Sequence, residues 1–140
     1  MLKGVNRLIA PPLLTALAEM GHGDEIAIVD ANFPAAEMAR RLVHTPGLDA
    51  PALLRAILTL LPLDDFVECP AAIMQSPAAQ PPVVDEFQAL LDAEAGRPVT
   101  LERLGRFEFY DRTRTAFAVV ATGEGRLYGN ILLRKGVIRP

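Results

Sequence analysis

Two short segments made almost entirely of apolar residues, Glu25–Asp30 and Ala116–Thr122, constrain the fold of this chain more than any other feature. Both are predicted to be strands. Because apolar residues in Glu25–Asp30 do not alternate with polar ones, both faces of that strand must be buried. A strand of this kind lies within a sheet that has helices on both sides.

Segments with helical spacing lie between the strands. Pro11-Pro12 can open a helix because the missing N–H groups would be unpaired there anyway, and Gly21 can end it in a left-handed cap. Further helices are predicted over Ala50–Leu61, with Asp49 as N-cap, and over Val83–Glu94, with Gly96 as C-cap. Other strands are predicted over Leu42–His44, within Phe66–Met74, over Val99–Leu104 and over Tyr128–Arg134, whereas Arg106–Arg114 fits a helix or a strand.

Strands interleaved with helices are typical of layered α/β proteins. We therefore expect a three-layer α/β/α domain with a central mixed sheet, and the length of 140 residues suits one domain over residues 1–140. The helix over Ala50–Leu61 is apolar on nearly every side, so it either packs deeply in the core or lies at a contact between subunits.

Composition excludes several classes of protein. With 51% hydrophobic and 22% charged residues, the chain is neither disordered nor of low complexity. The 14 Lys and Arg against 17 Asp and Glu argue against nucleic acid or a membrane surface as a partner. No apolar run approaches the ~18 residues of a membrane span, and Pro11-Pro12 interrupts the only run that resembles a signal peptide. The one cysteine, Cys69, excludes a disulfide framework, so we expect a cytoplasmic protein.

Two polar side chains flank the first buried strand. His22 lies between Gly21 and Gly23, which leave the imidazole uncrowded and suited to proton transfer, although a surface histidine in a turn is the commoner explanation. Asp30 follows the strand, where ligands of α/β sheets commonly bind, although it could equally form a turn or a cap. The two lie at opposite ends of one strand, so they meet only if the strand is short or another subunit folds over.

Further polar residues follow in the second half of the chain. Arg106 and Tyr110 lie in the aromatic and charged segment, and Tyr128-Gly129-Asn130 opens the last predicted strand. Their hydroxyl, amide and guanidinium groups could bind a polar ligand, or could belong to a turn and an edge. We interpret the remaining candidates structurally: Phe107, Phe109 and Cys69 as buried, His44 as structural, and the acidic pairs Asp24-Glu25 and Asp64-Asp65 as solvated caps. A metal site built from His22, Asp30 and His44 has no standard ligand spacing.

Several motifs, taken together and in order, resemble the ribose pyranase/fucose mutarotase family, on the side of its L-fucose mutarotase branch. The resemblance runs from the first residue nearly to the last. The segments that carry it are Met1–Gly4, Leu17–Ile26, Asp30–Ala35, Arg106–Tyr110 and Tyr128–Val137. The ribose pyranase branch is less similar, since it usually has Thr at Gly23 and Gly-Leu at Asn32-Phe33. The segment Val67–Val99 matches no motif.

This resemblance implies a three-layer α/β fold, rings of subunits that are commonly decamers, and sites at or near subunit contacts. It also implies interconversion of monosaccharide anomers, most often of L-fucose, without a cofactor or a metal. Position by position, His22 matches the family's proton donor. The sugar-binding positions correspond to Asp30, Arg106, Tyr128 and Asn130, with Gly129 between the last two and Tyr110 as a weaker match. The alternatives are a ribose pyranase, a non-catalytic sugar-binding ring and a metal-assisted hydrolase.

Overall fold

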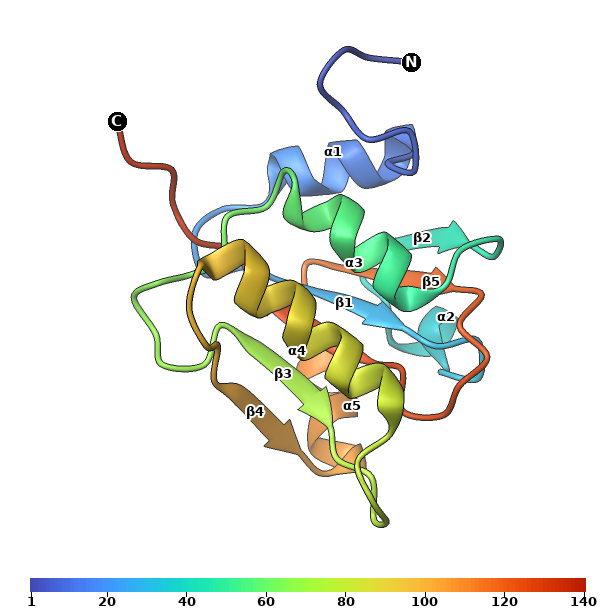
Figure 1. Ribbon diagram of the computed structural model, residues 1–140. Coiled ribbons are helices and arrows are strands. Elements are labelled where there is room, and N and C mark those ends of the chain that lie inside the picture. Colours follow the sequence, from blue (N-terminus) through green and yellow to red (C-terminus); the bar gives the residue numbers. More distant parts are fainter.

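A six-stranded sheet forms the centre of the molecule (Figure 1). The strands are β1 (Glu25–Val29), β2 (Leu42–Thr45), β3 (Ala71–Met74), β4 (Leu101–Leu104), β5 (Ala118–Thr122) and β6 (Ile131–Arg134). The computed structural model, which describes residues 1–140, arranges them in the order β2-β5-β1-β6-β3-β4. Five strands are parallel, and only β6 is antiparallel, pairing with β1 on one side and with β3 on the other.

Helices cover both faces of the sheet. They are α1 (Pro11–Glu19), α2 (Ala35–Met38), α3 (Ala50–Leu58), α4 (Pro82–Ala95) and α5 (Arg106–Thr115). Helices α1, α3 and α4 lie on one face, and α2 and α5 lie on the other (Figure 1). Ile26 and Ile28 point into the larger core, whereas Ala27 and Val29 point into the smaller one. The predicted three-layer fold with a mixed sheet is confirmed. None of the helices is long and apolar enough to cross a membrane.

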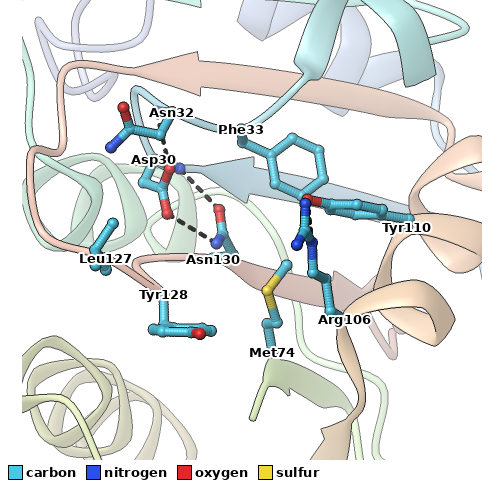
Figure 2. A pocket seen from close by; sticks show the side chains of 9 residues that line it. All are labelled: Asp30, Asn32, Phe33, Met74, Arg106, Tyr110, Leu127, Tyr128 and Asn130. Carbon is cyan, nitrogen blue, oxygen red and sulfur yellow. Dashed lines mark hydrogen bonds between the residues drawn. The ribbon is translucent and has the colours of Figure 1, made fainter. Parts of the chain in front are cut away.

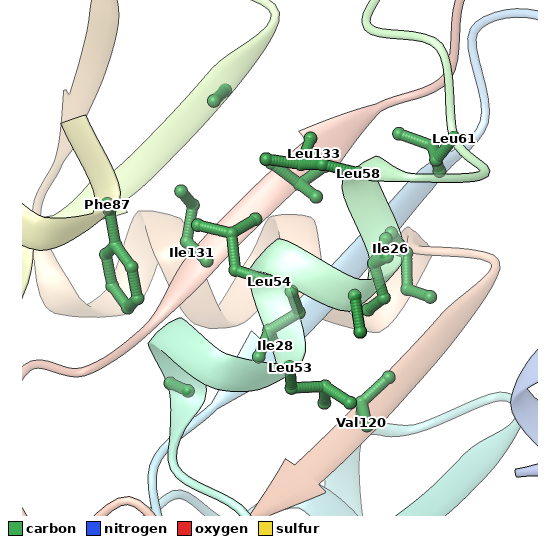
Figure 3. Packing of buried hydrophobic residues seen from close by; sticks show 14 of the residues in the cluster. Ile26, Ile28, Leu53, Leu54, Leu58, Leu61, Phe87, Val120, Ile131 and Leu133 are labelled. Atoms are coloured by element: carbon green, nitrogen blue, oxygen red, sulfur yellow. The ribbon is translucent and has the colours of Figure 1, made fainter. Parts of the chain in front are cut away.

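Helix α3 occupies the centre of the larger core (Figure 3). Leu53, Leu54 and Ile57 are completely buried between the sheet and α4. Burial of a side chain of this size contributes about 1.5–3 kcal/mol relative to exposure. Within one subunit, the apolar sides of this helix are therefore explained by deep packing. As predicted, the Asp49 side chain caps the helix by accepting a hydrogen bond from the Ala52 N–H at 2.8 Å.

Several predicted boundaries are wrong; for example, the strands predicted to begin at Val99 and Ala116 begin at Leu101 and Ala118. The helix that begins at Ala50 ends at Leu58 rather than Leu61. Gly21 does not form a left-handed cap; α1 ends at Glu19, and the left-handed residue is Gly23 with φ 87°. The last strand begins at Ile131 rather than Tyr128, because Tyr128 has φ 63° and cannot belong to an extended strand. Gly96, in contrast, is the C-cap of α4 as predicted, and it adopts a left-handed conformation with φ 65°.

The ambiguous segment Arg106–Arg114 is helical. Phe109 and Thr113, one helical turn apart, are both buried, whereas Phe107 is 73% exposed, so its predicted place in the core is wrong. Cys69 is only half-buried rather than buried. The four-residue helix α2 has no counterpart among the predicted elements.

The single antiparallel strand brings together residues from distant parts of the chain at two opposite edges of the sheet. We call the edge where the parallel strands end the carboxyl edge, and the opposite one the amino edge. Because β6 runs antiparallel to the other strands, Asn130, the residue before it, lies at the carboxyl edge beside Asp30, and its last residue, Arg134, lies at the amino edge beside Glu25. Residues that follow β1 thus meet residues that precede β6.

Candidate functional site

A cavity of about 210 Å³ opens at the carboxyl edge (Figure 2). Its size is below the ~300–1,000 Å³ of pockets for drug-sized ligands, so it suits a smaller molecule. It combines charged, amide and phenol groups with apolar side chains. The lining residues are Asp30, Asn32, Phe33, Met74, Arg106, Tyr110, Leu127, Tyr128 and Asn130.

Asp30 and Asn130 form the buried polar centre of this pocket. The Asn130 side chain donates to Asp30 Oδ2 and accepts from the Asp30 backbone N–H, both at 2.9 Å. The Asn32 N–H donates to the other carboxylate oxygen, also at 2.9 Å. Burial raises the pKa of Asp30 above its ordinary value, although the hydrogen bonds from Asn32 and Asn130 oppose the shift. No cation bonds this carboxylate, so it retains lone pairs that can accept hydroxyl groups of a ligand.

Arg106 and Tyr110 line the pocket from the first turns of α5. Arg106 Nε donates to the Tyr110 hydroxyl at 3.0 Å, and the guanidinium lies 5.4 Å from the centre of the Tyr110 ring. The Phe33 ring meets the Tyr110 ring edge to face at 5.3 Å. The helix thereby presents a cation and an aromatic surface towards Asp30 (Figure 2).

Tyr128 and Gly129 belong to a loop that packs against the Glu124 side chain. The Glu124 carboxylate is buried and accepts hydrogen bonds from the Arg126 side chain and backbone, which lower its pKa. A Cβ atom at Gly129 would lie 2.6 Å from Glu124 Cγ, so glycine is required for this close approach. The loop carries the Tyr128 side chain into the pocket (Figure 2).

His22 lies at the amino edge, away from the pocket. The five residues of β1 separate it from Asp30 by roughly 16 Å, at about 3.3 Å per residue. His22 Nε2 is 3.2 Å from Asp64 Oδ1, and Arg134 Nε donates to Asp64 Oδ2 at 2.9 Å. Burial alone would raise the pKa of Asp64, but hydrogen bonds from the Phe66 backbone, His22 and Arg134 outweigh it and hold this pKa below its ordinary value.

Backbone contacts fix the loop that carries His22. Gly23 adopts a left-handed φ of 87°, and its N–H donates to the Lys135 carbonyl at 2.8 Å. Lys135 Nζ donates to the carbonyls of Leu17 and Met20 at the end of α1. The lysine side chain therefore provides hydrogen-bond donors for the free carbonyl groups at the helix end, where Gly21 was predicted to form the cap.

The structure brings together most of the predicted site residues. Six of them, all except His22, meet at the carboxyl edge: Asp30, Arg106, Tyr110, Tyr128 and Asn130 line the pocket, and Gly129 supports the loop. His22 stands apart, as expected for a straight strand. His22, Asp30 and His44 do not form a metal-binding group, and His44 lies exposed on the edge strand β2.

The interpretation of the acidic pairs as solvated caps is wrong for two residues. Asp64 is 1% exposed and bonds His22, and Glu25 pairs with Arg112. Sequence reasoning also missed the pocket residues Asn32, Phe33, Met74 and Leu127. Asn32 and Phe33 lie two and three residues after Asp30, and this proximity in the sequence could have indicated that they line the same pocket. Nothing in the local sequence distinguishes Asp64 from its exposed neighbour Asp65.

The fold and the pocket define an α/β protein with a small, partly polar pocket at the carboxyl edge of its sheet, the place where ligands of such sheets commonly bind. The chain belongs to the RbsD/FucU transport protein family, whose profile matches residues 3–138. The family resemblance of the sequence is thus confirmed.

Individual relatives match the chain over nearly its full length. The fucose mutarotase of Homo sapiens is 50% identical, with 98% of this chain and 94% of the relative covered. The structure of the fucose mutarotase from Streptococcus pneumoniae in complex with L-fucose is 41% identical, covers 99% of this chain and 100% of its own, and has a TM-score of 0.94. Bacillus subtilis RbsD complexed with D-ribose, at 24% identity and a TM-score of 0.80 over 99% and 100% of the two chains, shares the fold.

Proposed function

We propose that this protein is a fucose mutarotase, an isomerase that interconverts the α and β anomers of L-fucose by opening and closing the sugar ring. The observation that carries the proposal is the full-length likeness to the S. pneumoniae fucose mutarotase in complex with L-fucose. The proposal takes residues 1–140 as one mutarotase domain. It includes a cytoplasmic site of action, supported by the single, unpaired Cys69.

In this proposal the sugar binds at the carboxyl edge. Asp30 and Asn130 hold sugar hydroxyls, because their mutual hydrogen bonds orient both side chains and leave acceptor positions open. Arg106 donates to a further hydroxyl. Tyr128 and Tyr110 contribute hydroxyl contacts or flat apolar surfaces for the sugar's C–H groups.

His22 is the proposed general acid–base, and it requires a second copy of the chain. Within one subunit His22 lies roughly 16 Å from Asp30, because the five residues of β1 lie between them at about 3.3 Å per residue. Exposed apolar side chains lie at both edges: Leu127 beside the pocket and Phe66 beside His22 are each 64% exposed. If the carboxyl edge of one copy contacts the amino edge of the next, both side chains are covered. We therefore propose a homo-oligomeric ring, with a decamer as the expected size.

The proposed reaction moves two protons and changes no oxidation state. A base removes the proton of the anomeric hydroxyl, the bond between C1 and the ring oxygen breaks, and an acid protonates the ring oxygen. The open aldehyde rotates about its C1–C2 bond and closes on the other face. His22 supplies or accepts one of these protons, since imidazole exchanges protons readily near neutral pH.

The deciding experiment is NMR saturation of one anomer of L-fucose, with transfer to the other anomer as the readout. We expect the protein to accelerate exchange of L-fucose more than that of D-ribose. Binding of L-fucose without acceleration would instead favour a non-catalytic sugar-binding protein. A larger effect on D-ribose would favour a ribose pyranase.

Mixed oligomers test whether two subunits build one site. Subunits with His22→Gln and subunits with Asn130→Ala are each expected to be nearly inactive. If they are unfolded and refolded together, roughly a quarter of the wild-type activity should return, because random assembly pairs an intact His22 with an intact pocket at one interface in four. No recovery from a mixture shown to contain both subunits would contradict the shared site. Sedimentation analysis of the wild type measures the ring size.

A further inference from the structure

Asp64 has the smallest exposed fraction of any carboxylate in the chain, and the proposed chemistry does not use it. It precedes β3, 42 residues from His22 in the sequence. The Asp64 N–H donates to the Arg134 carbonyl at 3.1 Å, and the Gly136 N–H donates to the Pro62 carbonyl at 2.8 Å. A Cβ atom at Gly136 would lie 2.5 Å from the Leu63 carbonyl oxygen, so this close pairing needs glycine. The backbone thus holds Asp64 beside the end of β6.

Both carboxylate oxygens of Asp64 are occupied. Oδ1 accepts from the Phe66 N–H at 3.1 Å and lies 3.2 Å from His22 Nε2, while Oδ2 accepts from Arg134 Nε at 2.9 Å. These contacts prevent rotation of the carboxylate. The same arrangement leaves Oδ1 in one fixed position towards the imidazole. The Phe66 ring packs against the His22 ring with the centres 5.2 Å apart, which limits the imidazole further.

We propose that Asp64 is a positioning residue for His22: its carboxylate holds the Nε2–H group and so assigns proton transfer with the sugar to Nδ1. The inference rests on the proposed function, in which His22 exchanges a proton with the substrate. It adds the identity of the reacting nitrogen and the group that selects it.

The chemistry of the carboxylate supports this assignment. Asp64 keeps a lowered pKa and is ionised at neutral pH, so it accepts hydrogen bonds and cannot donate one. The nitrogen that faces it must therefore carry the hydrogen, and the neutral ring then has its lone pair on Nδ1. Nδ1 makes no hydrogen bond within the subunit, and the His22 side chain is 45% exposed. The free nitrogen is thus available to a ligand.

The same contact favours the protonated stage of the reaction. When Nδ1 takes a proton from the sugar, the Nε2–H group remains hydrogen-bonded to Asp64, and the ring becomes positively charged. The adjacent carboxylate stabilises this charge without taking up the proton itself. When the ring returns the proton, it does so from Nδ1, and the ring orientation is unchanged throughout.

Substitution of Asp64 by Asn tests the inference directly. The introduced amide has one oxygen, which faces either His22 or Arg134 while the NH₂ group faces the other, so the tautomer of His22 is no longer determined. We expect the maximal exchange rate of L-fucose to fall about tenfold, which is less than the ~10²–10⁴-fold loss expected when the general acid–base itself is removed, with KM nearly unchanged. Asp65→Asn is the matched control, since Asp65 pairs with Arg139 and does not contact His22.

The tautomer is measured separately by ¹⁵N NMR of the imidazole at a pH where the ring is neutral. The chain has two histidines, and replacement of the exposed His44 by Gln leaves the signals of His22 alone. We expect the Nε2–H form in this single-histidine protein and a mixture of forms once Asp64→Asn is added.

The outcomes separate the inference from the proposed function. An Nδ1–H tautomer in the protein with Asp64 intact overturns the inference, even if the Asp64→Asn variant does not fold. So does a folded Asp64→Asn variant with the full exchange rate. Absence of L-fucose exchange in the wild type overturns the proposed function instead, whatever the tautomer.

Discussion

Asp30 and Asp64 are buried at opposite edges of the sheet, and their electrostatic surroundings are opposite. At the carboxyl edge, Asp30 bonds the neutral amide of Asn130, and burial raises its pKa. At the amino edge, hydrogen bonds to Asp64 from the Phe66 backbone, His22 and Arg134 outweigh burial, and its pKa is lowered. The comparison shows that hydrogen-bond and ion-pair partners, more than burial, determine the pKa of a carboxylate and therefore the groups that it can bind. An amide-paired carboxylate suits neutral hydroxyls, whereas a cation-paired one suits a ring that gains positive charge.

The largest expected effect comes from removal of the imidazole at the amino edge. His22→Gln should lower the rate of L-fucose exchange by ~10²–10⁴-fold, because it removes a general acid–base group. L-fucose should still bind, since the pocket at the carboxyl edge keeps all its lining residues. Saturation-transfer NMR measures exchange, and calorimetric titration measures binding in the same samples. Unchanged exchange would refute the role of His22.

The next effect concerns the amide at the carboxyl edge. Asn130→Ala removes the acceptor for the buried Asp30 N–H and the donor to the Asp30 side chain. We expect a loss of about 1–3 kcal/mol in the free energy of unfolding, because a buried polar group is left unsatisfied. Affinity for L-fucose should fall as well. Urea unfolding of the wild type, Asn130→Ala and the pocket-lining control Leu127→Ala measures the difference; equal stability of all three would show that water replaces the amide without cost.

Opposite pKa shifts predict opposite pH profiles of stability. For Asp64, the lowered pKa stabilises the fold above the unfolded-state value of about 3.9, and this contribution is lost as pH falls through the lower folded value. For Asp30, the contribution is fully present below about 3.9 and is lost as pH rises through the raised folded value. Urea unfolding of Asp64→Asn and Asp30→Asn between acid and neutral pH should thus give differences from the wild type that change in opposite directions. Parallel profiles would contradict the comparison.

The smallest effect tests how the His22 loop is held. Gly23→Ala places a side chain at φ 87°, with its Cβ 3.2 Å from Arg134 Nη2. We expect a loss of about 1 kcal/mol in stability, because residues other than glycine rarely adopt this conformation. A reduced exchange rate should accompany it if the displaced loop misplaces the ring. Gly125→Ala, where a Cβ meets no neighbour, is the control.

Local patterns in the sequence predicted most elements of the fold but not all of their limits. Glu25–Val29 was recognisable because its apolar side chains are buried on both faces. Segment Arg106–Arg114 was ambiguous because only Phe109 and Thr113 of its residues are buried, which leaves no clear apolar stripe. Tyr128 was wrongly included in a strand because its side-chain type favours strands, whereas the packing of Gly129 against Glu124 decides the turn.

The sequence by itself determined the class of fold and the residue types that could bind and isomerise a sugar, because hydrophobic periodicity and short motifs are properties of neighbouring residues. Only the tertiary structure decided which of those residues meet. The reversed strand β6 lies between β1 and β3 and carries Asn130 to Asp30 and Arg134 to Asp64, across 100 and 70 residues of chain. Pairings over such separations depend on strand order and direction, and no local pattern encodes them.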